Sequence, residues 1–231
     1  MNRNMKKIMI LSLLVLGVYA LSSCSGMNDN FDQYLANGEI IYIAKSDSVK
    51  VYPGKNRILV NFWIKDPRAA SMDIQWNQGK SSQKVAIDKT HDITAPIETY
   101  LENLEEGDYT LKLITCDSHG NKSVPDEYAV TVYGETYQSM LMCRNIKSSK
   151  VSGSKVTINW GSSFSSQEYG VNVYYTDTAG ASQCLTIPTD EIGTSTVISN
   201  VDVSKEVSCE TIYLPEETAI DYFCSEKQVI L

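Results

Sequence analysis

Short stretches in which apolar and polar positions alternate recur along the chain from about residue 39 onward. A period of two residues is typical of strands that bury one face, and no segment longer than ten residues shows the 3.6-residue period of an amphipathic helix. Turn-forming sequences such as Pro53-Gly54 and Asn77-Gln78-Gly79 separate the stretches. In the first half the pattern predicts strands at residues 39–44, 47–52, 58–63, 72–76, 84–87, 97–104, 109–115 and 128–132.

A similar but looser pattern runs through the second half, which begins near Gly134-Glu135. The first half ends in a strand that leads almost directly into the second half, without a Gly/Ser-rich linker. We therefore expect a stiff junction with a fixed angle between the halves. The pattern weakens after residue 217, so the last strand is the least well defined. The strands predicted in the second half cover residues 156–160, 171–175, 183–187, 197–201, 207–213 and 220–223, with Cys209 facing inward.

One corner of the first half has a characteristic sequence. Leu104, the Gly107-Asp108 turn and Tyr109 resemble the corner between strands E and F of a fibronectin type III module. In such sandwiches the tyrosine ring is buried and its hydroxyl bonds back to nearby backbone. We therefore predict an all-β protein of two tandem immunoglobulin- or fibronectin type III-like β-sandwiches, at residues 38–134 and 135–231.

The N-terminus has the three parts of an export signal. Basic residues at Arg3, Lys6 and Lys7 precede an apolar run, Ile8–Ala20, that is too short to span a bilayer comfortably. Leu21-Ser22-Ser23-Cys24 follows and resembles a lipobox, in which the cysteine thiol accepts a diacylglyceryl group. The sequence thus predicts a lipoprotein signal peptide at residues 1–23, lipidation of Cys24 and a tether at residues 24–37. The alternatives are an ordinary signal peptide with a chance cysteine, or an uncleaved anchor.

The residues after Cys24 bear on the membrane that carries the protein. Ser25, rather than Asp, follows the cysteine, which favours the outer membrane by analogy with other Gram-negative lipoproteins. The short acidic stretch at residues 28–32 resembles the export signals of surface lipoproteins but lacks their dense run of acids. We expect a lipid-anchored protein of the outer membrane that is exposed at the cell surface; the sequence leaves its leaflet open.

Charge limits the class of partner. The leader removes three of the 20 basic residues and none of the 28 acidic ones, so 17 basic residues remain and the mature net charge is −11. A protein that binds nucleic acid through phosphates needs a basic stripe. We therefore expect no nucleic-acid partner, and attachment to the membrane through the lipid alone.

Five cysteines remain besides Cys24, and no spacing among them resembles a zinc site or a redox pair. Export makes disulfides chemically possible. The odd number leaves at least one thiol free or paired between chains. The simplest interpretation is that they are small buried or half-buried apolar residues. Pairing stays open for Cys116, Cys143, Cys184, Cys209 and Cys224.

No catalytic or metal-binding constellation is recognisable. His91 and His119 both fall in predicted turns of the first half, without metal-ligand spacing, and the second half has no histidine for a nucleophile. The pairs at residues 105–106 and 216–217 are adjacent glutamates in turns rather than opposed carboxylates. We predict a non-enzymatic protein without metal or cofactor.

Two aromatic residues are candidates for ligand binding. Trp63 falls on the opposite face of its strand from Phe62, and Tyr174 is out of phase with Val171 and Val173. An exposed aromatic ring can stack on the apolar face of a sugar. Trp63 could instead pack under a loop or against the second sandwich, and a contiguous exposed apolar patch would favour binding.

Several segments together resemble a family of Bacteroidetes outer-membrane lipoproteins known only as a domain of unknown function. The resemblance covers about residues 30–225 and implies a setting beside polysaccharide-utilisation genes, but no catalytic residues. The segments that carry it are Glu39-Ile40-Ile41-Tyr42, Pro53-Gly54-Lys55-Asn56-Arg57, Asp73-Ile74-Gln75-Trp76-Asn77, Leu104-Glu105-Glu106-Gly107-Asp108-Tyr109, Tyr133-Gly134-Glu135-Thr136-Tyr137 and Tyr213-Leu214-Pro215-Glu216.

Two functional interpretations follow. The first is a surface-anchored accessory protein of a polysaccharide-utilisation system, which binds polysaccharide or the proteins of the outer-membrane importer. The second is a structural or adhesion module that mediates protein–protein contacts, for instance by strand pairing. Fold alone does not choose between them.

Overall fold

The computed structural model describes residues 41–88 and 90–231. The predicted signal peptide, Cys24 and the tether at residues 24–37 lie outside the described residues. Within residues 41–44 no strand forms, so that part of the predicted strand at 39–44 is wrong; residues 39 and 40 are not described. Among the described residues, no helix has both the length and the apolar character needed to cross a membrane.

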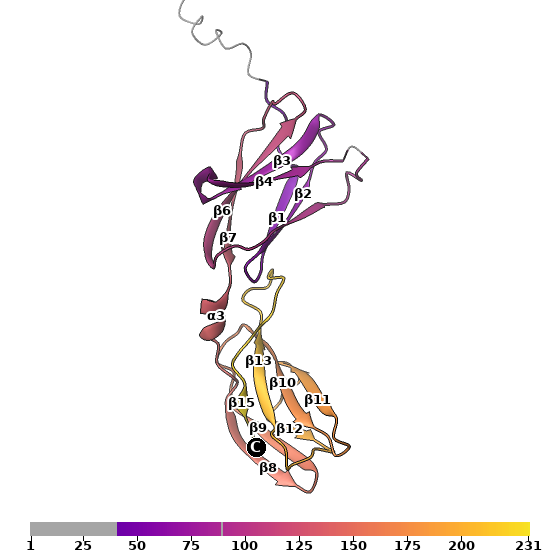
Figure 1. The fold of residues 1–231 in the computed structure, drawn as a ribbon, viewed down its shortest axis with the longest axis vertical. Helices are drawn as coiled ribbons and strands as arrows, with labels where there is room; N and C mark the ends of the chain where they lie inside the picture. Colours follow the sequence, from indigo (N-terminus) through magenta and orange to yellow (C-terminus); the bar gives the residue numbers. More distant parts are fainter. Residues whose placement is uncertain (1–40, 89) are drawn as a thin grey trace, which may run out of the picture. The chain divides into compact units, whose positions relative to one another are not determined.

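Seven strands of the first half form two antiparallel sheets (Figure 1). The order in the three-stranded sheet is β1-β2-β5 and in the four-stranded sheet β4-β3-β6-β7, and neighbouring strands run antiparallel in each. Their bounds are β1 Ser48–Pro53, β2 Ile58–Trp63, β3 Ala69–Trp76, β4 Ser81–Ala86, β5 Ile97–Leu101, β6 Gly107–Asp117 and β7 Asp126–Val132.

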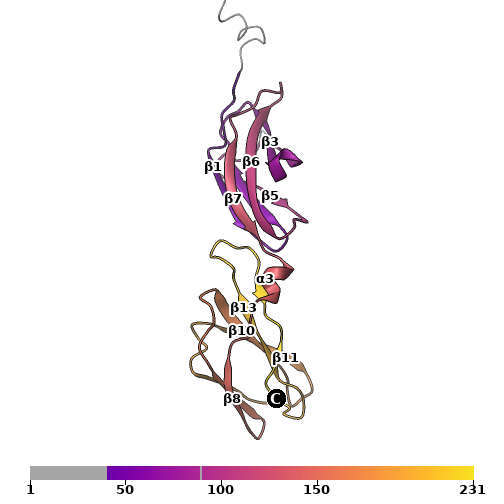
Figure 2. The ribbon, with the colours of Figure 1, turned by 90° about the vertical axis from the view of Figure 1, so that its left-hand side faces the viewer.

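The second half repeats this topology. The order in one sheet is β12-β9-β8 and in the other β11-β10-β13-β14, with β15 also paired to β13. The chain is therefore an all-β protein of two tandem fibronectin type III-like sandwiches (Figures 1 and 2). The bounds are β8 Ile146–Ser152, β9 Lys155–Trp160, β10 Glu168–Thr176, β11 Ser182–Pro188, β12 Ser195–Ile198, β13 Ser208–Tyr213, β14 Phe223–Cys224 and β15 Gln228–Val229.

Each sandwich has its own apolar core, built from the alternation that the sequence predicts. In β2, Ile58, Val60 and Phe62 are fully buried. In β10, Val171 and Val173 are fully buried between the sheets. Successive side chains of a strand point to opposite faces, so each strand contributes every second residue to a core. Cys209 faces the second core, as predicted.

The corner tyrosine is confirmed. The hydroxyl of Tyr109, in β6, donates a 3.0 Å hydrogen bond to the carbonyl of Glu105. The ring packs against the first core, whose members include Leu104 and Leu111. This bond fixes the turn that carries the chain from one sheet to the other. The turn also contains Glu106.

The segment between the sandwiches differs from the prediction. The first sandwich does not run directly into the second: a short helix, α3 (Glu135–Ser139), and residues 140–145 separate β7 from β8. The pattern does not predict β8, because five of its seven residues are lysines or serines on an edge strand. The strand predicted at 220–223 is instead mostly loop, and only β14 pairs there. Residues Ile43–Leu231, with both sandwiches, form one compact unit.

We expect Tyr109→Phe to lower the free energy of unfolding of the first sandwich by about 1 kcal/mol, because only the corner hydrogen bond is lost. Denaturant unfolding measures this change. Tyr100→Phe is the matched control, since Tyr100 lies on the same sandwich with 43% of its surface exposed. Equal stability of the two variants would show that the corner bond contributes nothing.

Candidate functional site

Trp63 lies where its position in β2 predicts, on the face away from the core. Its indole Nε1 donates a 3.2 Å hydrogen bond to the carbonyl of Thr94, and the ammonium of Lys50 lies 5.8 Å from the ring centroid. The ring thus packs against the loop that precedes β5. It also lines a shallow groove of about 400 Å³ together with Ile93. Part of the ring surface is available to a ligand there.

Tyr174 is less open than the sequence suggests. Its hydroxyl donates a 2.6 Å hydrogen bond to Glu210 of β13, and this bond is the main reason that its pKa is raised. The ammonium of Lys227 lies 3.8 Å from the ring centroid, so a cation covers one face of the ring. The structure places Trp63 and Tyr174 in different sandwiches and does not bring them together.

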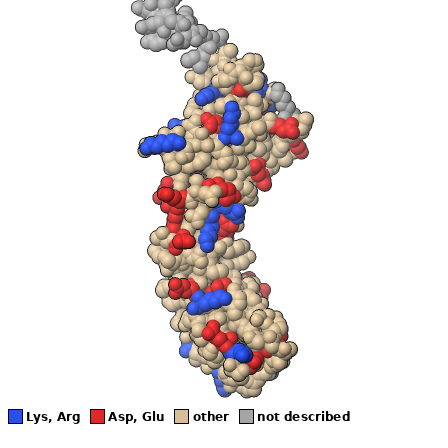
Figure 3. Space-filling model, viewed as in Figure 1, with Lys and Arg blue, Asp and Glu red and all other residues tan. Residues whose placement is uncertain are grey.

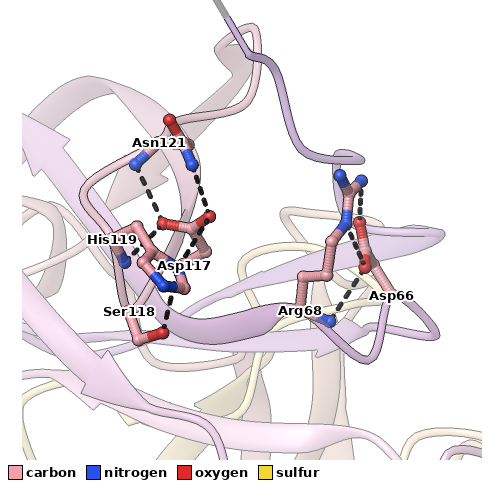
Figure 4. A network of polar contacts seen from close by, with 6 residues as sticks. All are labelled: Asp66, Arg68, Asp117, Ser118, His119 and Asn121. Atoms are coloured by element: carbon pink, nitrogen blue, oxygen red, sulfur yellow. Dashed lines mark hydrogen bonds and ion pairs between the residues drawn. The ribbon is translucent and has the colours of Figure 1, made fainter.

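The two histidines lie in loops, as predicted. Figure 4 shows His119 at the β6–β7 hairpin, where Asp117 accepts the backbone N–H groups of His119 and Asn121 at 2.8 and 2.9 Å. Asp117 therefore holds its own turn. The ring Nε2 of His91 lies 3.0 Å from the carbonyl of Ala95, within its own loop. Within the described ranges, no cluster of three or more His, Cys, Asp or Glu residues could hold a metal ion.

The most extensive polar arrangement joins the two sandwiches. We define the junction as the contact of the β1–β2 turn (residues 54–57) and Glu106 with α3 and the β13–β14 loop (residues 214–222). At its centre the carboxylate of Asp221 accepts two hydrogen bonds from the guanidinium of Arg57, at 2.6 and 2.9 Å. It also accepts the backbone N–H of Lys55 at 2.8 Å. The side chain of Asp221 is only 21% exposed.

This two-bond contact between a guanidinium and a carboxylate favours the charged form of both groups. The hydrogen bond from Arg57 holds the pKa of Asp221 below its ordinary value, and Asp221 in turn raises the pKa of Arg57. A planar guanidinium matches a carboxylate with two parallel bonds, which a lysine cannot do. Next to this pair, the N–H of Ile220 donates to the carbonyl of Pro53 at 2.9 Å. The loop therefore contacts the turn through side chains and backbone.

The same contact leaves no room for a side chain at Gly54. A Cβ atom there would lie 2.6 Å from an oxygen of Asp221 and 2.9 Å from Ile220, both closer than a real Cβ approaches. Gly134 is similar, because a Cβ would lie 2.9 Å from a carboxylate oxygen of Glu106. At these two glycines the first sandwich and the residues beyond it approach each other closely.

Glu106 provides the second polar contact. Its two carboxylate oxygens accept the backbone N–H groups of Thr136 and Tyr137, each at 2.7 Å, at the first turn of α3. Burial alone would raise the pKa of Glu106, but the N–H groups of Tyr137 and Thr136 outweigh it and the pKa is lowered. A carboxylate is favourable at a helix N-terminus, where N–H groups lack partners. The corner of the first sandwich thereby positions α3.

Aromatic rings lie in the junction beside these polar contacts. Tyr137 of α3 packs edge-to-face on Tyr133 at 4.9 Å and on Phe223 of β14 at 5.1 Å between centroids. The ammonium of Lys55 lies 5.6 Å from the Phe223 ring. The hydroxyl of Tyr133 donates to Glu216 at 3.4 Å. Edge-to-face contacts of this kind contribute about 0.5–1.5 kcal/mol beyond area burial.

An exposed aromatic pair lies close to the junction. Tyr169 of β10 and Tyr222 have centroids 4.6 Å apart with an interplanar angle of 48°. About half of each side chain is exposed, 50% and 51%. Sequence reasoning missed this pair, because Tyr222 lies in a segment without clear alternation. It also missed Asp221 for the same reason.

Replacing Asp221 by Asn keeps the shape of the side chain but removes the charge that holds Arg57. We expect the junction to weaken by about 1 kcal/mol, because the pair is partly exposed to solvent. Small-angle scattering should then show a broader distribution of interatomic distances. In the unsubstituted chain, the lowered pKa means that the contribution is present above the unfolded carboxyl value of about 3.9 and is lost as pH falls through the folded pKa.

The control is Asp66→Asn, which breaks a pair with Arg68 inside the first sandwich and should leave the distance distribution unchanged. An Asp221→Asn chain with the same distribution as the unsubstituted protein at neutral pH would contradict a role of this pair in the junction.

Comparisons with known proteins give a family. No curated protein is similar to the chain. A two-domain fibronectin type III segment of chicken tenascin shares 15% identity with a TM-score of 0.31, covering 80% of this chain and 97% of that one. The FN1–FN3 domains of chicken CNTN1 share 13% identity with a TM-score of 0.42, covering 82% of this chain and 64% of theirs. A family described as a domain of unknown function, DUF4998, matches residues 24–223. The chain therefore belongs to the DUF4998 family.

Proposed function

We propose that this protein is a lipid-anchored module of the cell surface, held at Cys24, whose coupled sandwiches serve a structural or adhesive role through contacts with other proteins. The anchor is proposed from the lipobox-like sequence at residues 21–24. Two acyl chains or more hold a protein stably at a membrane. The proposed location is the outer membrane, with the sandwiches exposed at the surface.

The observation that carries this proposal is the junction. Four segments with family resemblance, which contain Arg57, Glu106, Tyr137 and Glu216, all contribute to it. Residues of the segments that carry the resemblance thus couple the two sandwiches rather than line a cleft. Coupling of this kind suits a protein that has to present a surface at a defined distance from its anchor.

Strand β11 offers an edge at which another protein could bind. It is the outermost strand of its sheet, seven residues long, and all its residues except Ile187 are exposed. Each of the other edge strands with five or more residues carries charged residues, which discourage pairing, such as Lys84 in β4 and Lys150 in β8. The sequence of β11, Ser-Gln-Cys-Leu-Thr-Ile-Pro, carries none. An extended, uncharged segment of another protein can add to such an edge through main-chain hydrogen bonds.

A photo-crosslinking side chain placed at Leu185 of β11 tests this role in intact cells. We expect a covalent adduct with a partner chain from Leu185, and none from Lys84 of β4, the edge strand at the equivalent place in the first sandwich. Adding Cys24→Ser should move the protein to the soluble fraction and abolish the adduct. Equal adducts from both strands, or none from Leu185, would reject the role of β11.

The second candidate is polysaccharide binding, as an accessory protein of a polysaccharide-utilisation system and its outer-membrane importer. The groove at Trp63 and the exposed pair Tyr169 and Tyr222 favour it. Exposed rings of this kind bury the apolar face of a sugar while the ring edges stay solvated. Tyr174 is the weaker site, because Lys227 covers it.

Affinity electrophoresis in gels that contain polysaccharides tests this candidate. If the groove binds sugar, Trp63→Ala should weaken retention about tenfold, which corresponds to one lost stacking contact. If the Tyr169–Tyr222 pair is the binding surface instead, Tyr222→Ala should weaken retention and Trp63→Ala should leave it unchanged, so the two variants locate the site. Unretarded migration of the unsubstituted protein in every polysaccharide would exclude the role.

A further inference from the structure

Two thiols of the second sandwich lie unusually close together. The Sγ atoms of Cys143 and Cys209 are 3.3 Å apart. Cys143 lies in the segment between α3 and β8, and Cys209 lies in β13, so 65 residues separate them in sequence. Cys209 is fully buried, and Cys143 is half-buried and packs against the second core.

Hydrogen bonds on both sides hold Cys143 in this position. The carbonyl of the preceding residue, Met142, accepts a 2.6 Å hydrogen bond from the hydroxyl of Tyr213. The backbone N–H of the following residue, Arg144, donates a 2.6 Å bond to Oγ1 of Thr211. Both partners belong to β13, the strand that carries Cys209. The segment and the strand are therefore fixed in register on either side of the thiol pair.

A buried ion pair adds to this register. The guanidinium of Arg144 donates a hydrogen bond to the carboxylate of Glu168 at the start of β10, and both residues are buried. Breaking a buried pair is costly because it leaves an uncompensated charge. Cys143 thus cannot move away from Cys209 without disturbing its neighbour. A bonded sulfur pair requires a separation of ~2 Å, so the two Sγ atoms have to approach further for the bond to form.

We propose that Cys143 and Cys209 form an intramolecular disulfide when the exported chain meets a disulfide-containing oxidant, such as an oxidoreductase or oxidised glutathione. The thiolate of Cys143 attacks one sulfur of the oxidant's disulfide. The S–S bond of the oxidant breaks, its other sulfur leaves and takes up a proton to become a thiol, and the attacked sulfur stays bonded to Cys143 as a mixed disulfide. The sulfur of Cys209, losing its proton to solvent, then attacks Cys143 and releases the second thiol. Two protein thiols are oxidised, and one external disulfide is reduced to two thiols.

The order of attack follows from exposure and acidity. An external oxidant can reach the half-buried Cys143 but not the fully buried Cys209. The hydrogen bond with Cys209 lowers the pKa of the Cys143 thiol, and the same contact raises the pKa of Cys209. The thiolate is the nucleophile in exchange, so Cys143 reacts first. The pairing does not depend on the proposed function.

The experiment uses the full chain with Cys24→Ser, which retains five thiols, all free in the structure. The reduced protein is treated with excess oxidised glutathione, denatured, alkylated and digested for mass spectrometry. We expect one cross-link, which joins the peptides of Cys143 and Cys209, whether or not the exposed Cys184 carries glutathione. The melting temperature should rise by more than about 5 °C and return on reduction, because the bond closes a long loop.

Two variants complete the test. Cys116→Ser removes a thiol of the other sandwich and should keep the cross-link. Cys143→Ser should leave Cys209 reduced and abolish the shift in melting temperature. The proposal is overturned if all five thiols of the chain are alkylated after oxidation, if glutathione stays bound at Cys143, or if another pair of cysteines is linked. The central measurement needs no variant beyond Cys24→Ser, so misfolding of the others cannot obscure it.

Discussion

The contact between the carboxylate of Asp221 and the β1–β2 turn is the interaction on which the rest of the junction depends. Asp221 lies in the loop between two neighbouring strands of the second sandwich, yet its partners, Arg57 and Lys55, belong to the first. The loop leaves its own sheet to reach them, and β14, the strand that follows, has only two residues. Gly54 allows the approach because a Cβ would collide with Asp221. A glycine in the first sandwich is thus needed for a contact that a residue of the second sandwich makes.

No single contact of the junction is strong, and its effect comes from their combination. A partly exposed ion pair contributes at most about 1 kcal/mol, since water and salt screen it. Glu106, which caps α3, and the edge-to-face rings around Tyr137 act on the same short segment. Once one contact has formed, the others form at high effective concentration. The entropy cost of ordering the segment therefore arises once and not separately for each contact. On the face drawn in Figure 3, acidic and basic side chains lie interspersed, in keeping with local pairs rather than one broad field.

The sandwiches could be predicted from sequence because each core strand shows its alternation, as Ile58, Val60 and Phe62 do in β2. The corner tyrosine could be predicted because its hydrogen bond is local. Strand β8 could not, because an exposed edge strand needs no apolar face, and α3 could not, because five residues hold less than two helical turns. The prediction that Trp63 and Tyr174 bind a ligand stays untested, although the structure shows Tyr174 beneath Lys227. The sequence around Asp221 does not indicate its role, because its partner, Arg57, lies 164 positions earlier in the chain.

The segment after α3 explains how a contact made at the junction can be transmitted to the second sandwich. Arg144 and Glu168 form a buried pair in which Nε of the arginine and Oε2 of the glutamate have no partner among the described residues. Such a pair is weak evidence for stability, because desolvation offsets most of its attraction. The register of the segment on β13 is set instead by two hydrogen bonds, from the backbone N–H of Arg144 to Thr211 and from the hydroxyl of Tyr213 to the carbonyl of Met142. A segment aligned in this way cannot slide, so α3, which Glu106 holds at one end, is fastened at the other end as well. The coupling of the sandwiches is therefore continuous from the first core to the second, and a disulfide at Cys143 would make its last link covalent.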